Sequence, residues 1–463
     1  MENAVQQRLA FGGRCATMAL AAHSIYKVYI VSSKNGRGQA QKTAGFLSGA
    51  VMERPVVGII CEYDPFHRGH RRQFELIRQK LPGAAIVCLM SGPFTQRGMP
   101  ALFTPAYRAE AALRAGADMV LELPCAFAVR DAEHFALGGV DILSRLGFVT
   151  HLSYGTEDDT IDLTPAARLL ERPTEAFLQL LHKQLDKGSS FAAAQGAALA
   201  ACAGGGMLPE GIWQQPNLIL ALCYRRAMLR LNSPLQPLPV QRVGGYHDGE
   251  LPTVAGGQSE ATVAYPSATA VRRAYLGGDV SAAEAACGYP LPHAGDGMPV
   301  CPPDALDRVL LHTLRSMTPA QLQQLPLCTE GLEHRLAAAA RQATNRESLL
   351  DALKTKRYAR ARLSRLCTHG LLGVTQELLE AHPLPEYVRL LGFRKESAGL
   401  LSHLRQSNIP VIAKAADGDL QNPLYALDNA AYDLWALGAG IPAGLMLRMN
   451  VVRLEGSKTE AAP

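Results

Sequence analysis

The sequence predicts an α/β fold in which a parallel β-sheet comes first and a mainly helical C-terminal region follows. From residue 56 onward, short apolar runs alternate with amphipathic stretches of helical length, which is the pattern of consecutive βαβ units. The stretches 162–232 and 304–382 have helical patterns instead. A chain of 463 residues with 48% hydrophobic and 19% charged residues is long enough for two or three globular domains.

The predicted elements follow one another in βαβ order. Apolar runs at the start of the chain's regular part predict four strands, at 56–61, 84–90, 119–123 and 150–154. The intervening stretches predict helices at 69–80, 105–115 and 131–147, the second of them with Pro105 in its first turn. The Ala/Gly-rich stretch 192–206 is expected to be a loop or turn. Because parallel strands end at one edge of their sheet, ligands are expected in the loops that follow them.

Composition shifts suggest how the chain is divided. Residues 1–51 have scattered Gly, Ser and Lys without periodicity, and we interpret them as a non-native or disordered extension. The first domain is then expected at 52–288. The Pro/Gly-rich stretch 289–305 predicts a linker, 306–450 a mainly helical region and 451–463 a frayed tail.

Charge is placed unevenly along the chain. The whole sequence carries 46 basic and 41 acidic residues, a net charge of +5. Residues 1–51 hold six of the basic residues and one acidic residue, which leaves 40 of each sign in the remainder. The high apolar content and low net charge exclude a mainly disordered chain. Because the main body is neutral, a nucleic-acid partner has to be argued from local patches.

The cysteine pattern and the hydropathy pattern exclude further classes. None of the ten cysteines forms a CxxC pair, so we expect reduced thiols in a cytoplasmic protein and no metal site. No run of 18 uncharged apolar residues exists in the sequence, and therefore no membrane-spanning helix and no membrane partner are expected.

The first motif that carries chemistry is EYDPFHRGH, at 62–70, where the first strand turns into the first helix. His67 and His70 are three residues apart at a helix N-terminus, so both imidazoles can face one point. Gly69 lets a phosphate approach the backbone, and the helix N-terminus favours anions. The motif predicts a site where the α-phosphate of a nucleoside triphosphate is attacked, with catalysis by positioning and charge stabilisation. The structural alternative is that one histidine caps the helix and the other packs on a neighbour.

The second motif is YPSATAVRR, at 265–273. Ser267 can cap a helix, which leaves Thr269 and Arg272 in the first turns to reach phosphate oxygens. The alternative is an ordinary capped helix with solvated arginines. The occurrence of HxGH in the same chain favours the phosphate-binding interpretation.

The third motif is a basic stretch at 354–365 with six basic residues in twelve and no acidic residue. On a helix, Lys356, Arg360 and the next turn would share a face, while Tyr358 could stack on a base or pack inward. A basic run is usually a solvated face. In a neutral body, however, this local concentration favours contacts with RNA phosphates. The predicted contacts are Lys354, Lys356, Arg357, Arg360, Arg362 and Arg365.

HxGH followed much later by SxTxxR resembles the pattern of the nucleotidyltransferase superfamily, which implies a Rossmann-like domain. More closely, the chain is similar to the bacterial tRNA(Met) cytidine acetate ligase family. The similar stretches span about 310 residues in the expected order: 58–70, 90–98, 116–124, 132–143, 154–157, 215–224, 242–248, 266–274 and 355–366.

The resemblance implies an enzyme that adenylates acetate with ATP and passes the acetyl group to N4 of the wobble cytidine of elongator tRNA(Met). It implies ATP, with Mg²⁺ as the partner of ATP, and a helical region that binds the anticodon part of the tRNA. The catalytic residues would be His67 and His70. The implied ATP contacts are Ile60, Cys61, Glu62, Tyr63, Asp64, Pro65, Phe66, His67, Arg68, Gly69, His70, Arg71, Arg72, Gln73, Gly155, Asn217, Arg242, Ser267, Thr269 and Arg272.

Several positions depart from that family's pattern or stay open. Asp64 and Arg68 stand where Asn is more usual, as does Pro93, and Leu218 replaces a frequent second Asn. These departures affect the expected affinity more than the reaction type. In the loop 91–98, Gln96 and Arg97 face either ATP or the cytidine, or belong to a plain loop.

Two other functions are compatible with the motifs. One is a nucleotidyltransferase that adenylates a small metabolite without RNA, and the long C-terminal region and its basic helix argue against it. The other is a non-catalytic RNA-binding protein on the same fold, which the presence of both histidines disfavours. No general base for the cytidine amine is identifiable from the sequence.

Overall fold

The computed structural model describes residues 54–189, 191–202, 215–242, 251, 265–293, 295–329, 331–355 and 358–455. The predicted extension at 1–51 and most of the predicted tail lie outside these residues. The chain from Met52 to Pro463 forms one compact unit. Among the described residues, no helix is long and apolar enough to cross a membrane.

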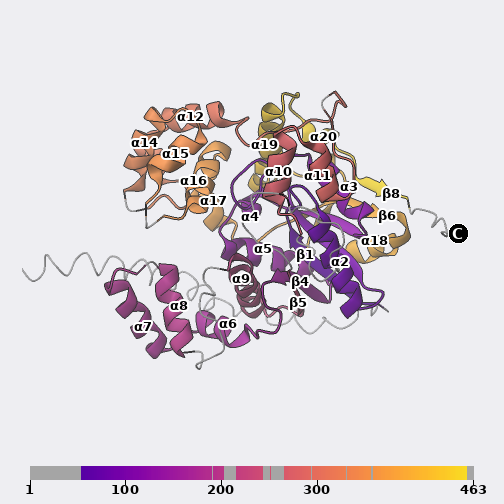
Figure 1. Ribbon diagram of the computed structural model, residues 1–463, viewed down its shortest axis with the longest axis horizontal. Helices are drawn as coiled ribbons and strands as arrows, with labels where there is room; N and C mark the ends of the chain where they lie inside the picture. The colour runs from indigo at the N-terminus through magenta and orange to yellow at the C-terminus, as the bar shows by residue number, and fades with distance from the viewer. Residues whose placement is uncertain are drawn as a thin grey trace, which may run out of the picture. The chain divides into compact units, whose positions relative to one another are not determined.

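A single eight-stranded sheet forms the centre of this unit (Figure 1). Its order is β5-β4-β1-β2-β3-β6-β7, and β8 also pairs with β6. All neighbours are parallel except β3 and β6, which are antiparallel. The strands are β1 Val56–Cys61, β2 Ala85–Ser91, β3 Met119–Leu123, β4 His151–Thr156, β5 Gln236–Gln241, β6 Val388–Arg394, β7 Val411–Ile412 and β8 Val452–Leu454.

Three of the first helices occupy the positions that the sequence pattern predicts between the strands, namely α2 Arg68–Lys80, α3 Pro105–Arg114 and α5 Ala132–Arg145. The short helix α4 Cys125–Ala128 was not predicted. The next group is α6 Thr164–Glu171, α7 Glu175–Asp186, α8 Phe191–Cys202 and α9 Pro216–Arg230. The short helix α8 shows that the loop predicted over 192–206 is wrong for residues up to Cys202. Alanine is the strongest helix former, and it outweighs the single glycine in this stretch.

Strand β1 shows how the sheet is buried on both faces. Val56 and Ile60 belong to one apolar cluster, whereas Val57, Ile59 and Cys61 belong to another on the opposite face. This alternation follows from the two-residue period of a strand. A parallel strand that is covered on both faces has a continuous run of apolar residues in its sequence. Strand β1 is predicted correctly for this reason.

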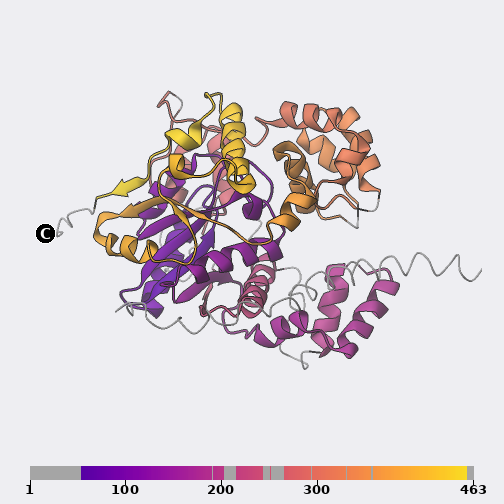
Figure 2. The same cartoon turned by 180° about the vertical axis from the view of Figure 1, so that it is seen from behind.

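Two helices precede the predicted linker, α10 Ala268–Leu276 and α11 Val280–Cys287. Four of the helices that follow it have an apolar core of their own. The helices from the linker to residue 381 are α12 Asp307–Ser316, α13 Pro319–Gln323, α14 Leu332–Gln342, α15 Arg346–Leu353, α16 Arg360–Leu372 and α17 Gln376–Ala381. Buried leucines of α12, α14, α15 and α16 pack together, among them Leu310, Leu336 and Leu366. Both ribbon views show α12 and α14–α16 gathered in one helical group (Figures 1 and 2). The remaining elements are the short helices η4 Lys395–Ser397, α18 Gly399–Leu404 and η5 Ala415–Asp417, then α19 Pro423–Gly438 and α20 Leu445–Arg448.

The structure corrects two of the predicted domain limits. The stretch predicted as a linker is packed: the Tyr289 hydroxyl donates to the Phe66 carbonyl, and Leu291 and Cys301 are buried. The chain beyond residue 387 returns to the central sheet, because β6 pairs with β3 and Arg389 forms a buried ion pair with Glu122 at 2.6 Å. The region 306–450 is therefore not a single helical body, because its part beyond residue 387 completes the sheet.

Candidate active site

A cavity of about 340 Å³ opens where β1, β4 and β5 end. Because these strands are parallel, their carboxyl ends lie at one edge, as expected for a ligand site in an α/β sheet. Most of the predicted ATP contacts line it: Ile60, Cys61, Glu62, Tyr63, Asp64, His67, Gly69, His70, Arg72, Gln73, Gly155, Asn217, Arg242, Ser267, Thr269 and Arg272.

Four of the predicted ATP contacts do not line the cavity. Pro65 and Phe66 are buried beneath it, where the Phe66 ring packs against the His70 ring at 5.4 Å between centroids. Arg68 and Arg71 are exposed on α2. Pro65 and Phe66 precede α2, and their side chains are buried in the core instead. Within α2, the helical period directs Gly69, His70, Arg72 and Gln73 toward the cavity and leaves Arg68 and Arg71 exposed.

His67 and His70 form a reciprocal cap at the start of α2. His67 is the N-cap residue, and its Nδ1 accepts the Gly69 backbone N–H at 3.1 Å. The Nδ1 of His70 accepts the His67 backbone N–H at 3.2 Å. Both rings therefore use Nδ1 as an acceptor, and each neutral ring carries its proton on Nε2. The capping role and the ligand-facing role, which the sequence poses as alternatives, are both fulfilled by these two residues.

The electrostatics keep both imidazoles neutral. Burial lowers the pKa of His67 to about 3, and the positive charges of Arg242 and Arg272 act in the same direction. Burial, His67 and Arg242 lower the pKa of His70 well below its usual value. Two neutral Nε2–H donors next to arginines and a helix N-terminus suit polyphosphate oxygens.

Arg272 is held toward the same cavity by Asp64. Its guanidinium donates to the Asp64 backbone carbonyl and lies 3.3 Å from the Asp64 carboxylate. The other Asp64 oxygen accepts the Leu102 backbone N–H at 2.7 Å. On α10, Ser267 caps the helix by accepting the Ala270 N–H at 3.1 Å, and the Thr269 hydroxyl accepts from Arg272 at 3.3 Å. The two predicted phosphate-binding motifs therefore meet at Asp64.

Residues from three segments far apart in the sequence converge on the cavity's other side. The Arg242 guanidinium donates to Asn217 Oδ1 at 2.9 Å. Asn217 Nδ2 in turn donates to Glu157 at 2.8 Å. A Cβ atom on Gly155 would lie 2.8 Å from Arg242 Cγ and Cδ. Glycine at position 155 therefore lets the Arg242 side chain lie flat against strand β4.

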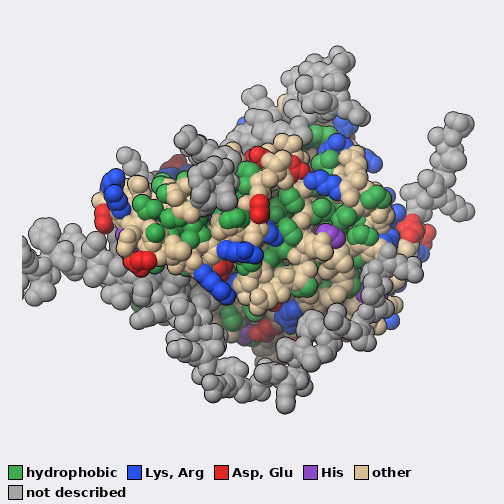
Figure 3. All heavy atoms as spheres, turned by 90° about the horizontal axis from the view of Figure 1, so that it is seen from below, with side chains coloured by type: hydrophobic (Ala, Val, Ile, Leu, Met, Phe, Trp, Pro, Cys, Tyr) green, Lys and Arg blue, Asp and Glu red, His purple; other side chains and the backbone are tan. Residues whose placement is uncertain are grey.

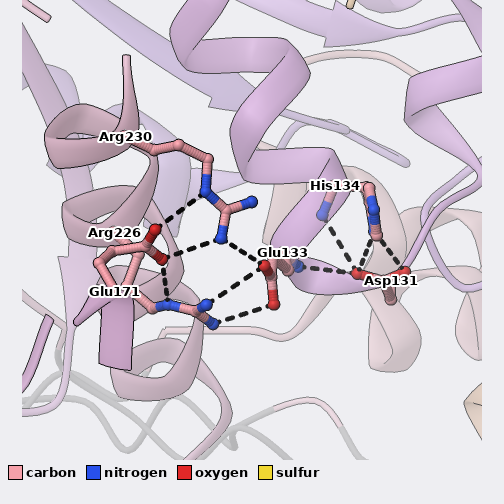
Figure 4. A network of polar contacts seen from close by, with 6 residues as sticks. All are labelled: Asp131, Glu133, His134, Glu171, Arg226 and Arg230. Carbon is pink, nitrogen blue, oxygen red and sulfur yellow. Dashed lines mark hydrogen bonds and ion pairs between the residues drawn. The ribbon is translucent and has the colours of Figure 1, made fainter. Parts of the chain in front are cut away.

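An ion-pair network fixes helix α9, which presents Asn217 from its first turn (Figure 4). Arg226 bonds Glu133 of α5 at 2.9 Å and Glu171 of α6 at 2.8 Å. Arg230 lies one turn further and bonds the same two carboxylates, at 2.8 and 2.9 Å. Bidentate arginine–carboxylate pairs are directional. The network therefore fixes the rotation of α9 and with it the position of Asn217.

A buried arginine of α3, Arg108, joins the two loops that follow β1 and β2 and border the site. Its guanidinium donates to the backbone carbonyls of Glu62 at 2.5 Å, Ser91 at 3.1 Å and Phe103 at 3.3 Å, and also to that of Gly92. The side chain is 1% exposed. A planar group with five donors suits several carbonyls arranged around it.

The loop 92–98 connects the cavity to the helical group. Arg97, Thr95 and Met99 line the cavity. The Gly98 carbonyl accepts from Arg346 and from the Thr368 hydroxyl, each at 2.5 Å. Gly98 has a positive φ of 74°, and a Cβ there would lie 2.9 Å from the Arg365 Cα atom. Glycine at position 98 is thus required both by its backbone conformation and by the approach of α16.

The structure corrects the predicted RNA-binding helix. Helix α15 ends at Leu353 and α16 begins at Arg360, so the basic stretch does not form one helix. Arg365 is 9% exposed and donates to the Gln96 carbonyl at 3.3 Å, so it packs α16 against the loop instead of facing solvent. Arg360 is ion-paired with Glu347 and, at 2.6 Å, with Asp351. Lys356 and Arg357 lie outside the described residues.

Some residues of the site were not found from the sequence. Ser153, Tyr224 and Tyr265 line the cavity, and Arg108 and Arg346 hold its loops. Ser153 accepts from Gln73 at 3.4 Å. The position of Ser153 two residues before Gly155 is the one available signal, because alternate strand residues share a face. The arginines carry no sequence signal, since an arginine inside a helix pattern is usually solvated.

Metal binding by the protein itself has no support in the described part of the chain. No group of three or more His, Cys, Asp or Glu side chains is placed there to hold an ion. The cysteines in the described ranges are all unpaired thiols.

A mostly parallel sheet with an HxGH helix N-terminus and a second cationic helix start at the same edge defines a nucleotidyltransferase site. Consistent with this, residues 54–441 match the HIGH Nucleotidyl Transferase family, and the chain belongs to that family.

Individual relatives within this family give a more specific assignment. A protein of Acetivibrio thermocellus named tRNA(Met) cytidine acetate ligase is 34% identical over 379 residues, which cover 78% of this chain and 88% of the relative. The Bacillus subtilis protein of the same name is 31% identical over 399 residues, 82% of this chain and 92% of the relative. The chain is thus a member of the tRNA(Met) cytidine acetate ligase family.

A solved structure agrees with this assignment. Thermotoga maritima TmcAL bound with alpha-thio ATP is similar with a TM-score of 0.75 and 27% identity, over 87% of this chain and 100% of that chain. The apo form of the same protein is similar with a TM-score of 0.76.

Proposed function

We propose that this chain is an ATP-dependent acetate ligase that forms acetyl-adenylate and transfers the acetyl group to N4 of the wobble cytidine of elongator tRNA(Met). The observation that carries the proposal is the pair of neutral histidines of HxGH, facing one cavity with Arg272 and Arg242. The names of the relatives supply the substrate class.

The first step joins acetate and ATP. An acetate oxygen attacks the α-phosphate, and pyrophosphate leaves. Mg²⁺, as the partner of ATP, would neutralise part of the charge on the phosphates. The Nε2–H groups of His67 and His70 stabilise charge on the phosphate oxygens, and Thr269 and Arg272 hold the departing pyrophosphate. Asn217 and Gly155 hold the nucleoside side of ATP, and Arg242 clamps its phosphates. Fixed donors of this kind are already oriented before the reaction, which is the source of their catalytic effect.

The second step uses the reactive mixed anhydride. The exocyclic amine of the cytidine attacks the acetyl carbonyl, and AMP leaves. For this step the anticodon base must enter the cavity unstacked, as is usual in sequence-specific RNA recognition. Loop 92–98, which lies between the cavity and α16, is the surface we assign to the entering nucleotide, with Gln96 and Arg97 as its contacts.

The tRNA surface is proposed around the start of α16. Lys354, Lys356, Arg357, Arg360 and Arg362 remain its proposed contacts, whereas Arg365 acts through loop 92–98. On the face that Figure 3 draws, the described Lys and Arg side chains lie scattered between apolar and acidic ones and gather in no basic patch. At the start of α16 we propose binding through a few separate phosphate contacts. A tRNA-modifying role also supports a cytoplasmic location.

The test is incubation of the protein with ATP, isotopically labelled acetate and bulk bacterial tRNA, followed by nucleoside mass spectrometry. The expected product is labelled N4-acetylcytidine that disappears when ATP is omitted. Acetate-dependent pyrophosphate release without label in tRNA would retain the adenylating site and refute the acceptor. Failure of both would favour adenylation of another small metabolite.

A further inference from the structure

Two carboxylates line the cavity in the described part of the chain, Glu62 and Asp64. Asp64 has a structural task, since one oxygen accepts the Leu102 N–H and the other pairs with Arg272. Protonation of Asp64 would break its pairing with the residue that faces the phosphates. Asp64 is therefore unsuited to accept a proton during turnover.

Glu62 is held differently. It follows the last residue of β1, and its Oε1 accepts the Gln96 backbone N–H at 2.5 Å. This one contact orients the carboxylate without neutralising it. Burial and the nearby Asp64 raise the pKa of Glu62, while the Gln96 N–H, Arg97 and Arg272 lower it. Arg108 of α3 and Tyr224 of α9 also interact with it electrostatically.

The other titratable groups of the cavity are poor proton acceptors. The Nδ1 atoms of His67 and His70 are occupied by backbone N–H groups, and their Nε2 atoms already carry protons. Burial raises the pKa of Tyr63, Tyr224 and Cys61 well above their usual values, so these groups stay protonated. Among the carboxylates, imidazoles and thiol of the described lining residues, Glu62 is therefore the remaining proton acceptor.

We propose that Glu62 is the general base of the acetyl-transfer step, an assignment that rests on the proposed function. The cytidine N4 forms a bond to the acetyl carbon while one N4 proton moves to the Glu62 carboxylate. The bond between the acetyl carbon and the AMP phosphate oxygen then breaks, and AMP leaves as the anion. The carboxylic acid returns its proton to water before the next turnover. The nucleophile needs this help because an exocyclic amine conjugated to the pyrimidine ring is weakly basic.

The experiment separates the two half-reactions in Glu62→Gln. Adenylation is followed as acetate-dependent release of pyrophosphate without tRNA, and transfer as single-turnover formation of N4-acetylcytidine from enzyme preloaded with ATP and labelled acetate. General-base catalysis contributes about 100-fold or more. The ratio of transfer rate to adenylation rate is therefore expected to fall about 100-fold in the variant. In the wild type the transfer rate should also decline at low pH as Glu62 is protonated, and this limb should be absent in Glu62→Gln.

Glu110→Gln is the matched control, because Glu110 is a partly exposed carboxylate on α3 that pairs with Arg114 and does not line the cavity. It should keep the wild-type ratio. A parallel loss of both half-reactions in Glu62→Gln would indicate a structural role and overturn the proposal, as would a raised KM for acetate with an unchanged ratio. A wild-type protein that makes no N4-acetylcytidine would instead refute the proposed function itself.

Discussion

The imidazole rings of His67 and His70 are stacked, with centroids 3.7 Å apart and an angle of 26° between the ring planes. Each ring binds a backbone N–H through Nδ1. The helix N-terminus therefore fixes the tautomer of both residues, and the same contacts that cap α2 direct two N–H donors at the cavity. These two side chains therefore contribute both to the stability of α2 and to the site, and suitable substitutions can separate the two contributions.

Loss of the Nε2–H donor should affect catalysis more than folding. Asparagine is a good N-cap residue, so His67→Asn is expected to keep the cap and the melting temperature of the wild type. His67→Ala loses the cap as well, at about 1 kcal/mol. Both variants should slow adenylation by about 10²–10³-fold, measured as acetate-dependent pyrophosphate release. Full adenylation by His67→Asn would contradict the role of this histidine.

The low pKa of His67 predicts an acid-sensitive contribution to stability. An unfolded histidine titrates near pH 6.5, whereas folded His67 titrates at about 3, so between these values the unfolded chain binds more protons. The free energy of unfolding should consequently fall as the pH is lowered from 6.5 toward 3. Denaturant titrations at several pH values test this, with His67→Asn showing a weaker dependence. A ring that titrates near 6.5 by NMR would contradict it.

A methyl group at position 155 should displace Arg242. Gly155→Ala places its Cβ against the Arg242 side chain, which can move because it is flexible, so little change in melting temperature is expected. The lost contact with ATP is a charge-assisted one, for which about 1.5–3 kcal/mol corresponds to a rise of about 10–100-fold in the KM for ATP.

Gly399→Ala is the matched control for this substitution. Gly399 is the first residue of α18, outside the cavity lining, and a Cβ there would meet no atom within 4 Å. The same exchange at this position should therefore leave the KM for ATP at the wild-type value. An unchanged KM in Gly155→Ala as well would exclude Arg242 from ATP binding.

Arg108 should prove essential for the order of the two loops that follow β1 and β2. Arg108→Ala leaves several buried carbonyls without donors, and we expect a loss of at least about 3 kcal/mol in the free energy of unfolding. Arg108→Lys restores the charge and part of the donors, and should recover part of the stability. Chemical denaturation and both half-reaction rates measure the effect. Wild-type stability in Arg108→Ala would contradict the assigned role.

Two arginines of α16 should behave differently toward tRNA. The Arg360 side chain is 41% exposed, and its replacement by Ala should weaken tRNA binding and lower the salt dependence of the binding constant by about one unit of slope. Arg365 is buried against Gln96, so Arg365→Met should lower the melting temperature and leave the salt slope unchanged. Filter binding at several salt concentrations distinguishes them. Equal slopes in Arg360→Ala and the wild type would remove Arg360 from the RNA surface.

Elements with local sequence signals were predicted correctly, and elements that depend on distant partners in the chain were not. The strands at 56–61 and 119–123 and the helix at 69–80 agree with the structure within one residue at each end, because buried parallel strands and capped helices have local signals. Strand β6 was missed, since its pairing with β3 depends on a partner more than 260 residues earlier. The RNA-binding helix was predicted from charge alone, and charge does not reveal that Arg365 is buried.

The sequence by itself determined the reaction class, because HxGH and SxTxxR are short motifs whose chemistry follows from residue type and spacing at a helix start. The tertiary structure decided which groups cooperate. Only the packing shows that Asp64 is committed to Arg272, that Arg242 reaches Asn217 over Gly155, and that α16 rests on the loop next to Glu62. These contacts join segments that are 25 to 270 residues apart in the chain, and no local sequence preference encodes them.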